Sequence, residues 1–233
     1  MKKLIYILSI ICSITLFTSC DTTSDDPSKI TYFVDMEMNG DEILMHAKSE
    51  PFIDPGCSAI LNGENITDQI VTKGSVDVNK LGLYTISYSA SNEDGISKSL
   101  TRKVYVYDAT ESILKSGVYT TDKTSYRLYG GATTAYGGYN IVIYQTSPGE
   151  FYITDFFGGW YEQRAGYGSN YAMTGHFKLN EDNIIELSDS HLIGWDDSIV
   201  KMENSTYDPD TGTISWDVTY ASGMLFRVIL KKQ

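Results

Sequence analysis

The segment Asp155–Tyr171, DFFGGWYEQRAGYGSNY, gathers side chains that can bind a sugar. It holds two Phe, one Trp and three Tyr together with four Gly. Trp and Tyr rings offer large apolar faces with a polar handle, and such faces stack on the C–H surfaces of sugars. So much glycine argues against a strand, so we expect a loop, and long loops in compact β folds are often functional. The alternative is a packed corner, in which the rings close one end of a β domain.

Polar neighbours of these rings could bond to sugar hydroxyls. A second segment, HLIGWDDS, places a Trp and two Asp directly after a Gly. The sequence does not show whether the two segments meet in space. The ligand-binding candidates are Trp160, Tyr161, Glu162, Arg164, Tyr167, Tyr171, Trp195 and Asp196.

Patterns for catalysis are weak along the chain. The three His residues do not form H-E-x-x-H or paired Cys/His spacings, so we expect no metal site and no cofactor. The GYGSN sequence around Ser169 is not the G-x-S-x-G of a serine hydrolase. Glycoside hydrolysis needs two carboxylates roughly 5–9.5 Å apart, a distance that a sequence does not reveal. We therefore expect no enzyme, and a small glycoside hydrolase stays an alternative.

The N-terminal residues have the layout of an export signal. Two lysines precede the uncharged run Leu4–Phe17, and TSC closes it at Cys20. The run has the length of a signal-peptide core and is short for a membrane span, which needs about 20 apolar residues. Small residues followed by Cys resemble the lipobox of bacterial lipoproteins. The resemblance implies a signal peptide at 1–19, lipid attachment at Cys20 and an acidic tether at 20–29.

The net charge restricts the classes of molecule that the protein can bind, and the cysteine content restricts its disulfides. The formal net charge is −12, and it becomes −14 when the two lysines leave with the signal peptide. No basic surface is left to cover phosphates, so nucleic acid is excluded as a partner. Attachment to the outer membrane must then come from acyl chains rather than from a basic patch. Cys57 would be alone in the folded part, so no intramolecular disulfide is expected.

Residues 30–108 read as short strands separated by turns. In Gly82–Ala90, GLYTISYSA, larger side chains alternate with Thr and Ser, which is the pattern of a half-buried strand. The sequences FIDPGCSAI, GSVDVNKLGLYTISYSASNEDG and RKVYVYD together resemble the bacterial surface-protein Ig-like repeat. The resemblance implies a β-sandwich that acts as a spacer, with Tyr84 in the structural place of a tyrosine corner.

Residues 117–233 predict a second β domain. Eight or nine strand patterns are joined by compact turns such as SPG, NEDN, DPDTG and ASG, which indicates an antiparallel meander closed as a small β-barrel or folded as a sandwich. Trp216 alternates within GTISWDVTY and is expected in the core. The fold class is therefore all-β, with helix scarce. The ending STYDPDTGTISWDVTYASGMLFRVILKKQ resembles the C-terminal domain of Bacteroidetes lipoproteins found beside SusC/SusD-type importers.

Together these patterns predict a lipoprotein of the outer membrane that faces the cell exterior. It would bind an extracellular ligand, a glycan in our interpretation, without catalysis and as an accessory to nutrient uptake. A structural or assembly role beside a SusC/SusD-type importer is the alternative from another class. A binding module predicts saturable affinity for a soluble glycan, which an assembly accessory should lack.

Overall fold

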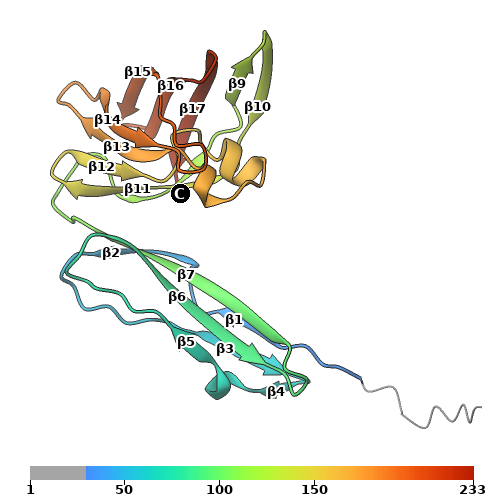
Figure 1. Cartoon of the computed structure of the whole chain (residues 1–233). Helices are drawn as coiled ribbons and strands as arrows, with labels where there is room; N and C mark the ends of the chain where they lie inside the picture. The colour runs from blue at the N-terminus through green and yellow to red at the C-terminus, as the bar shows by residue number, and fades with distance from the viewer. Residues whose placement is uncertain (1–29) are drawn as a thin grey trace, which may run out of the picture.

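The protein is described by a computed structural model that covers residues 30–233. The predicted signal peptide, the lipid-attachment residue Cys20 and the tether at 20–29 lie outside the described residues. Strands β1–β7 fall in the first half of the chain and strands β8–β17 in the second, and each half builds its own sheets (Figure 1). No helix of the described chain is long and apolar enough to cross a membrane.

The first half is an Ig-like sandwich, as the sequence predicts. One sheet has the order β1-β3-β4 and the other the order β2-β7-β6-β5, with β2 parallel to β7 and the other pairs antiparallel. The strands are β1 (Asp35–Met38), β2 (Ile43–Ala47), β3 (Cys57–Leu61), β4 (Glu64–Asn65), β5 (Val71–Lys73), β6 (Gly82–Ser91) and β7 (Ser97–Tyr107). A 3₁₀ turn at Thr67–Gln69 joins β4 to β5. Cys57 is buried between the sheets as a free thiol.

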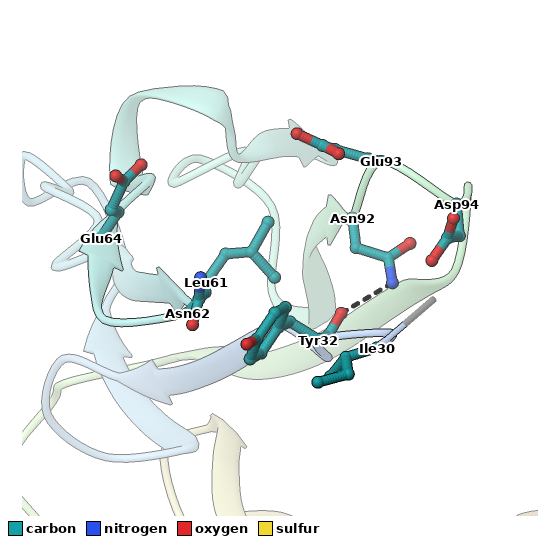
Figure 2. Close-up of a pocket in the computed structure, with 8 residues that line it drawn as sticks. All are labelled: Ile30, Tyr32, Leu61, Asn62, Glu64, Asn92, Glu93 and Asp94. Atoms are coloured by element: carbon teal, nitrogen blue, oxygen red, sulfur yellow. Dashed lines mark hydrogen bonds between the residues drawn. The ribbon is translucent and has the colours of Figure 1, made fainter. Parts of the chain in front are cut away.

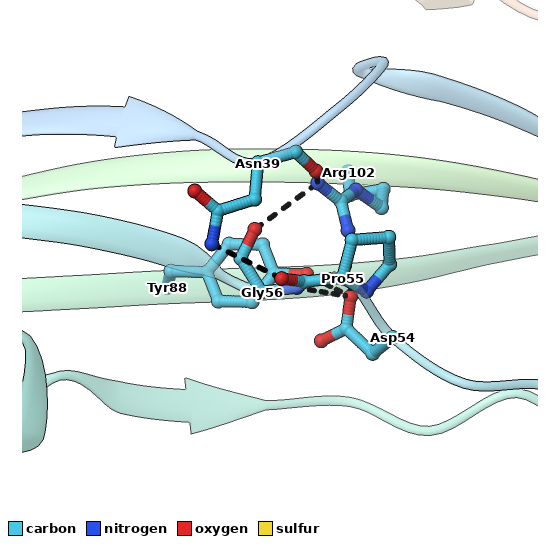
Figure 3. A network of polar contacts seen from close by, with 6 residues as sticks. All are labelled: Asn39, Asp54, Pro55, Gly56, Tyr88 and Arg102. Atoms are coloured by element: carbon cyan, nitrogen blue, oxygen red, sulfur yellow. Dashed lines mark hydrogen bonds and ion pairs between the residues drawn. The ribbon is translucent and has the colours of Figure 1, made fainter.

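The Asp-Pro-Gly motif of this domain surrounds a buried arginine (Figure 3). Arg102 of β7 is 0% exposed, and its guanidinium donates to Asp54 Oδ1 at 2.7 Å and to the carbonyls of Asn39 at 2.6 Å and Gly56 at 3.1 Å. The Tyr88 hydroxyl donates to the same carboxylate oxygen at 2.6 Å. Because a buried charge needs partners, this network fixes the motif between the two sheets.

Tyr84 stands at the entrance of β6 and bonds locally. Its hydroxyl donates to the backbone carbonyl of Lys80, four residues upstream, at 2.9 Å. A bond from a tyrosine hydroxyl to backbone a few residues earlier is the geometry of a tyrosine corner. The structural role expected for this residue therefore agrees with its contacts.

The second half is one antiparallel sheet that curls into a half-barrel. Strand β17 pairs with β16 along its length, and on its other edge it pairs first with β9 and then with β8. The remaining order runs β8-β11-β12-β13-β14, while β10 follows β9 and β15 follows β16. The strands are β8 (Gly117–Thr121), β9 (Ser125–Tyr129), β10 (Ala132–Tyr136), β11 (Asn140–Ser147), β12 (Glu150–Ile153), β13 (Thr174–Leu179), β14 (Ile185–His191), β15 (Lys201–Asp208), β16 (Thr213–Tyr220) and β17 (Met224–Lys232).

Aromatic side chains dominate the core of the half-barrel. Phe151, Phe156, Phe157 and Phe226 are fully buried there. Trp216 is fully buried as well, and its indole N–H donates to the Phe156 carbonyl at 2.9 Å. The predicted core position of Trp216 is confirmed, and its polar atom is satisfied as a buried indole requires.

The two domains pack against each other through a small apolar cluster. Tyr105 of β7 is buried with Val142 and Tyr144 of β11. Beside this cluster, the Gln145 amide donates to the carbonyls of Asp108 at 3.2 Å and Thr110 at 2.9 Å. The link between the domains is thus tied to the second sheet by hydrogen bonds.

Candidate functional site

The aromatic segment leaves β12 at Asp155, whose carboxylate is fully buried. Oδ1 accepts the backbone N–H groups of Phe157 at 2.8 Å and Met173 at 3.0 Å, and Oδ2 accepts that of Gly159 at 2.9 Å. One side chain therefore ties the beginning of the loop to its end. Burial raises the pKa of this carboxyl to about 7, although the three N–H donors act in the opposite direction.

Two consecutive glycines turn the chain after this anchor. Gly158 and Gly159 have positive φ values of 61° and 85°, and a Cβ on Gly159 would lie 2.6 Å from the Cβ of Tyr139. The chain then forms a single π-helical turn, Trp160–Arg164, followed by a 3₁₀ turn, Ser169–Tyr171. Sequence reasoning predicted an irregular loop and missed these turns, which are too short to show a helical period. Single π turns are frequent at functional sites.

Trp160 and Tyr161 point into the half-barrel and are only 5% and 8% exposed. The Trp160 indole meets Tyr136 edge-on, with ring centroids 5.0 Å apart, and Tyr161 packs edge-on against Phe157, with ring centroids 5.7 Å apart. Packing of this kind leaves neither ring a face for a sugar. The packed-corner alternative therefore describes these two candidates, which support the loop from below.

Three other candidates form what we call the aromatic patch: Tyr167, Tyr171 and Trp195. Tyr167 is 55% exposed, Trp195 is 44% exposed and Tyr171 is half-buried. Trp195 meets Tyr171 edge-on at 5.0 Å and Tyr161 at 4.9 Å, while Tyr167 lies parallel to Tyr161 at 6.2 Å. Rings held by other rings keep their orientation, which lowers the entropy lost on binding.

The structure brings together the two segments that the sequence left apart. The backbone N–H of Gly194 donates to the Asn170 carbonyl at 2.7 Å. A Cβ on Gly194 would lie 2.6 Å from the Tyr171 ring, so only glycine allows this approach. Trp195 also stacks on Tyr220 of β16, with their ring centroids 6.5 Å apart. The sequence analysis did not assign Tyr220 to the site.

The polar candidates point in different directions. Glu162 lines a cleft of about 270 Å³ between the domains, together with Lys103 and Tyr105. Arg164 lies over the Trp160 indole, with its guanidinium carbon 4.2 Å from the ring centroid. Asp196 is exposed beside the aromatic patch, and its carboxylate lies 3.1 Å from the His191 ring nitrogen.

Arg127 of β9 is a further residue of this region that sequence reasoning missed. Its guanidinium carbon lies 4.7 Å from the Trp160 ring centroid and 5.3 Å from that of Tyr129. The only signal in the sequence is an Arg between two Tyr in SYRLYG. Because Arg127 lies far from the loop along the chain, the sequence does not reveal its contact with Trp160.

A hollow larger than the cleft beside Glu162 lies in the Ig-like domain, at the end away from the half-barrel (Figures 1 and 2). It contains none of the predicted site residues. Its volume is about 340 Å³, and Asn92 on its wall donates to the Tyr32 carbonyl at 2.8 Å. Within residues 30–233, no group of three His, Cys, Asp or Glu side chains is placed to hold a metal ion. The aromatic patch therefore remains the strongest candidate site.

Two family models match the chain. The bacterial surface protein Ig-like domain matches residues 36–106, and the BT2262-like C-terminal domain matches residues 106–232. No protein with a curated description matches. Neither of the two matching models indicates a catalytic family.

The similarities to solved structures differ in extent. The lipoprotein BT2262 from Bacteroides thetaiotaomicron is 51% identical, with a TM-score of 0.79 over 86% of this chain and 100% of that one. The M60 catalytic domain of Clostridium perfringens ZmpB with its CBM51 domains is 17% identical, with a TM-score of 0.29 over 53% of this chain and 15% of that one. The second similarity is too slight to support an argument. The first, with the two domain matches, shows that this chain belongs to the family of the lipoprotein BT2262, which implies association with a cell surface or membrane.

Proposed function

We propose that this protein is anchored by lipid at Cys20 in the outer membrane, faces the cell exterior and binds a glycan with the aromatic patch. It performs no catalysis and serves as an accessory to nutrient uptake, beside a SusC/SusD-type importer. The observation that carries the proposal is the pair of exposed rings, Trp195 and Tyr167, held edge-on to each other at 6.2 Å by packed neighbours.

The aromatic patch has the features of a sugar-binding surface. Exposed rings in contact with one another are unusual on a soluble surface and mark interaction sites. Carboxylates of Asp196 and Asp197 lie next to Trp195 in the chain and can accept hydrogen bonds from sugar hydroxyls. The ring faces can stack on the C–H surfaces of a sugar, and the carboxylates can accept hydrogen bonds from its hydroxyls.

The arrangement of the domains supports presentation of this patch away from the membrane. The described chain enters at the far end of the Ig-like domain, and the half-barrel stands at the opposite end (Figure 1). The apolar cluster around Tyr105 and Tyr144 joins the two. A lipid anchor at the N-terminal side would thus leave the Ig-like domain as a spacer beneath the half-barrel.

The test is a titration of tryptophan fluorescence with a panel of soluble oligosaccharides. The mature protein is held in a non-ionic detergent without a sugar headgroup. The chain has three Trp, and Trp195 is the exposed one, so binding at the patch should shift its emission. Tyr167→Ala removes a ring of the patch and keeps this reporter, and it should weaken affinity about tenfold or more, equivalent to at least about 1.4 kcal/mol. Ile193→Ala, on the same loop as Trp195, is the matched control.

Two outcomes would decide the question. A saturable shift that is weakened in Tyr167→Ala and kept in Ile193→Ala supports glycan binding. The absence of a response to every sugar would overturn it and favour the assembly role. In that case Trp195→Ala should instead reduce the recovery of the neighbouring importer with this protein.

A further inference from the structure

Two arginines gather next to the aromatic patch. The guanidinium carbons of Arg127 and Arg164 lie 4.7 Å and 4.2 Å from the centroid of the same indole, that of Trp160. A guanidinium stacked on a ring keeps its N–H edge free, and that edge matches a carboxylate or sulfate in shape and charge. The exposed Arg164 therefore keeps this edge available, whereas Arg127, which is half-buried, also bonds to the Tyr161 hydroxyl.

Neither arginine has an acidic partner in residues 30–233. The other two arginines are paired: Arg102 lies 2.7 Å from Asp54, and Arg227 lies 3.3 Å from Asp217. No ion pair within 4.0 Å joins a described carboxylate to Arg127 or Arg164. Since the chain has 30 acidic against 18 basic side chains, two unpaired arginines at one ring are an unexpected local excess of positive charge.

The buried Nε atom of Arg127 does not by itself indicate a ligand. This atom has no hydrogen-bond acceptor within residues 30–233, but the Nε atom of the paired Arg102 has none either. The absence of an ion pair is therefore what distinguishes Arg127 from Arg102. The nearby acid Glu162 lines the cleft between the domains.

The cations and the aromatic patch are parts of one surface. Tyr161, the residue after Trp160, contacts Trp195 at 4.9 Å and Tyr167 at 6.2 Å. Burial raises the pKa of the Tyr161 hydroxyl, and both the charge of Arg127 and a hydrogen bond from its side chain act against that rise. A ligand on the patch can therefore reach the arginines with one substituent.

We propose that the patch takes an acidic glycan: a sugar face rests on Trp195 and Tyr167, and a carboxylate or sulfate of the same chain is bound by Arg164 and Arg127. This inference rests on the proposed glycan binding and specifies its ligand class. Neutral sugars would bind through the rings alone. Acidic ones would gain charge-assisted hydrogen bonds, which are the stronger kind.

The experiment compares matched ligands by isothermal titration calorimetry on the mature protein in detergent. Oligogalacturonates are set against their methyl esters, and sulfated galactan oligosaccharides against unsulfated ones, so that carboxylate and sulfate are tested separately. We expect the preferred acidic ligand to bind about fivefold tighter than its neutral counterpart at low salt, with the preference shrinking as salt rises.

Variants separate this inference from glycan binding itself. Arg164→Gln removes an exposed cation and should abolish the preference while leaving affinity for the neutral ligand. Lys178→Gln removes one exposed charge from β13, away from the loop, and should leave the preference intact. Trp195→Ala should weaken both ligands of a pair alike.

The outcomes are distinguishable. Equal affinity within both ligand pairs, or a preference that survives in Arg164→Gln, overturns the acidic-glycan inference and leaves glycan binding standing. A failure of every sugar to bind overturns both. A preference for one acidic member that disappears only in Arg164→Gln supports the inference and identifies whether carboxylate or sulfate is the group recognised.

Discussion

Asp54 in the Ig-like domain and Asp155 in the half-barrel both hold a loop in place, and they do so with different partners. Asp54 accepts hydrogen bonds from the Arg102 guanidinium at 2.7 Å and the Tyr88 hydroxyl at 2.6 Å. Asp155 is fully buried and accepts three backbone N–H groups at 2.8–3.0 Å, with no ion pair in the described chain. The first carboxylate is neutralised by a cation and the second only by dipoles.

This difference separates a structural motif from a loop that carries a candidate site. Arginine keeps its charge at every pH that a protein tolerates, so the Asp54–Arg102 pair supplies a permanent cation. Dipoles offset the burial of Asp155 incompletely, and the pKa of this carboxyl is raised to about 7. The motif of the Ig-like domain is thus fixed by a charge pair, while the loop below the aromatic patch is held by a carboxyl group whose pKa is raised to about 7.

The largest effect should follow from Arg102→Ala. The variant removes the guanidinium donor from the Asp54 carboxylate and from two backbone carbonyls, and it opens a cavity in the sandwich. We expect the free energy of unfolding of the Ig-like domain to fall by about 3–5 kcal/mol, the usual cost of breaking a buried ion pair. Urea denaturation measures it. Lys98→Ala, which removes the exposed pair with Asp35, is the control and should cost less than about 1 kcal/mol.

Two glycines allow a closer test of the loops themselves. Gly56 and Gly159 both have positive φ, 72° and 85°, and both donate their N–H to the anchoring carboxylate. A Cβ on Gly56 would be 4.0 Å from the nearest atom, whereas one on Gly159 would be 2.6 Å from Tyr139. Gly56→Ala should therefore cost only the left-handed strain of about 1–2 kcal/mol. Gly159→Ala adds overpacking of about 1–3 kcal/mol.

Thermal denaturation of the two glycine variants gives the comparison directly. Equal losses of stability would mean that Tyr139 moves aside at no cost. The close packing under the loop would then be softer than its contacts indicate, and the aromatic patch would rest on a more adaptable base.

The sequence predicted the Ig-like domain better than the loop, and the reason is the range of the interactions. The alternation of larger and smaller side chains over Gly82–Ala90 corresponds to β6, Gly82–Ser91. Successive side chains of a strand point to opposite faces of the sheet, so the local sequence alone shows which face is buried. The curl of the second sheet could not be predicted, because it depends on β17 pairing with both β8 and β9 on one edge. No local pattern encodes a strand that changes its neighbour halfway.

The candidate site was predicted in composition but not in orientation. Which rings face solvent is decided by partners far along the chain: Trp160 is buried by Tyr136 and Phe226, while Trp195 leans on Tyr220. The anchoring role of Asp155 is hidden for the same reason, since one of its donors is the N–H of a residue eighteen positions later. The sequence alone gives this acid no role beyond its place at the beginning of the aromatic segment.

Asp155→Asn should loosen the loop while leaving the Ig-like domain intact. An asparagine oxygen can still accept two of the three N–H groups, but its amide nitrogen would face the N–H of Gly159, donor against donor. We expect a loss of about 1–3 kcal/mol, the cost of a buried unsatisfied group. Hydrogen exchange of residues 155–171 should accelerate, whereas exchange in β6 and β7 should not change. Acceleration in both domains would contradict a local anchor.

The most discriminating effect is the pH dependence of the same anchor. The pKa of Asp155 is raised to about 7 in the folded protein, and that of an unfolded aspartate is about 3.9. Between these values the folded state binds more protons than the unfolded state, so the contribution of this group to stability is largest below about pH 4 and falls as pH rises to about 7. The difference in melting temperature between the wild type and Asp155→Asn isolates that contribution. A difference that grows in favour of the wild type with rising pH would show that the three N–H groups outweigh burial and hold the Asp155 carboxylate in its charged form.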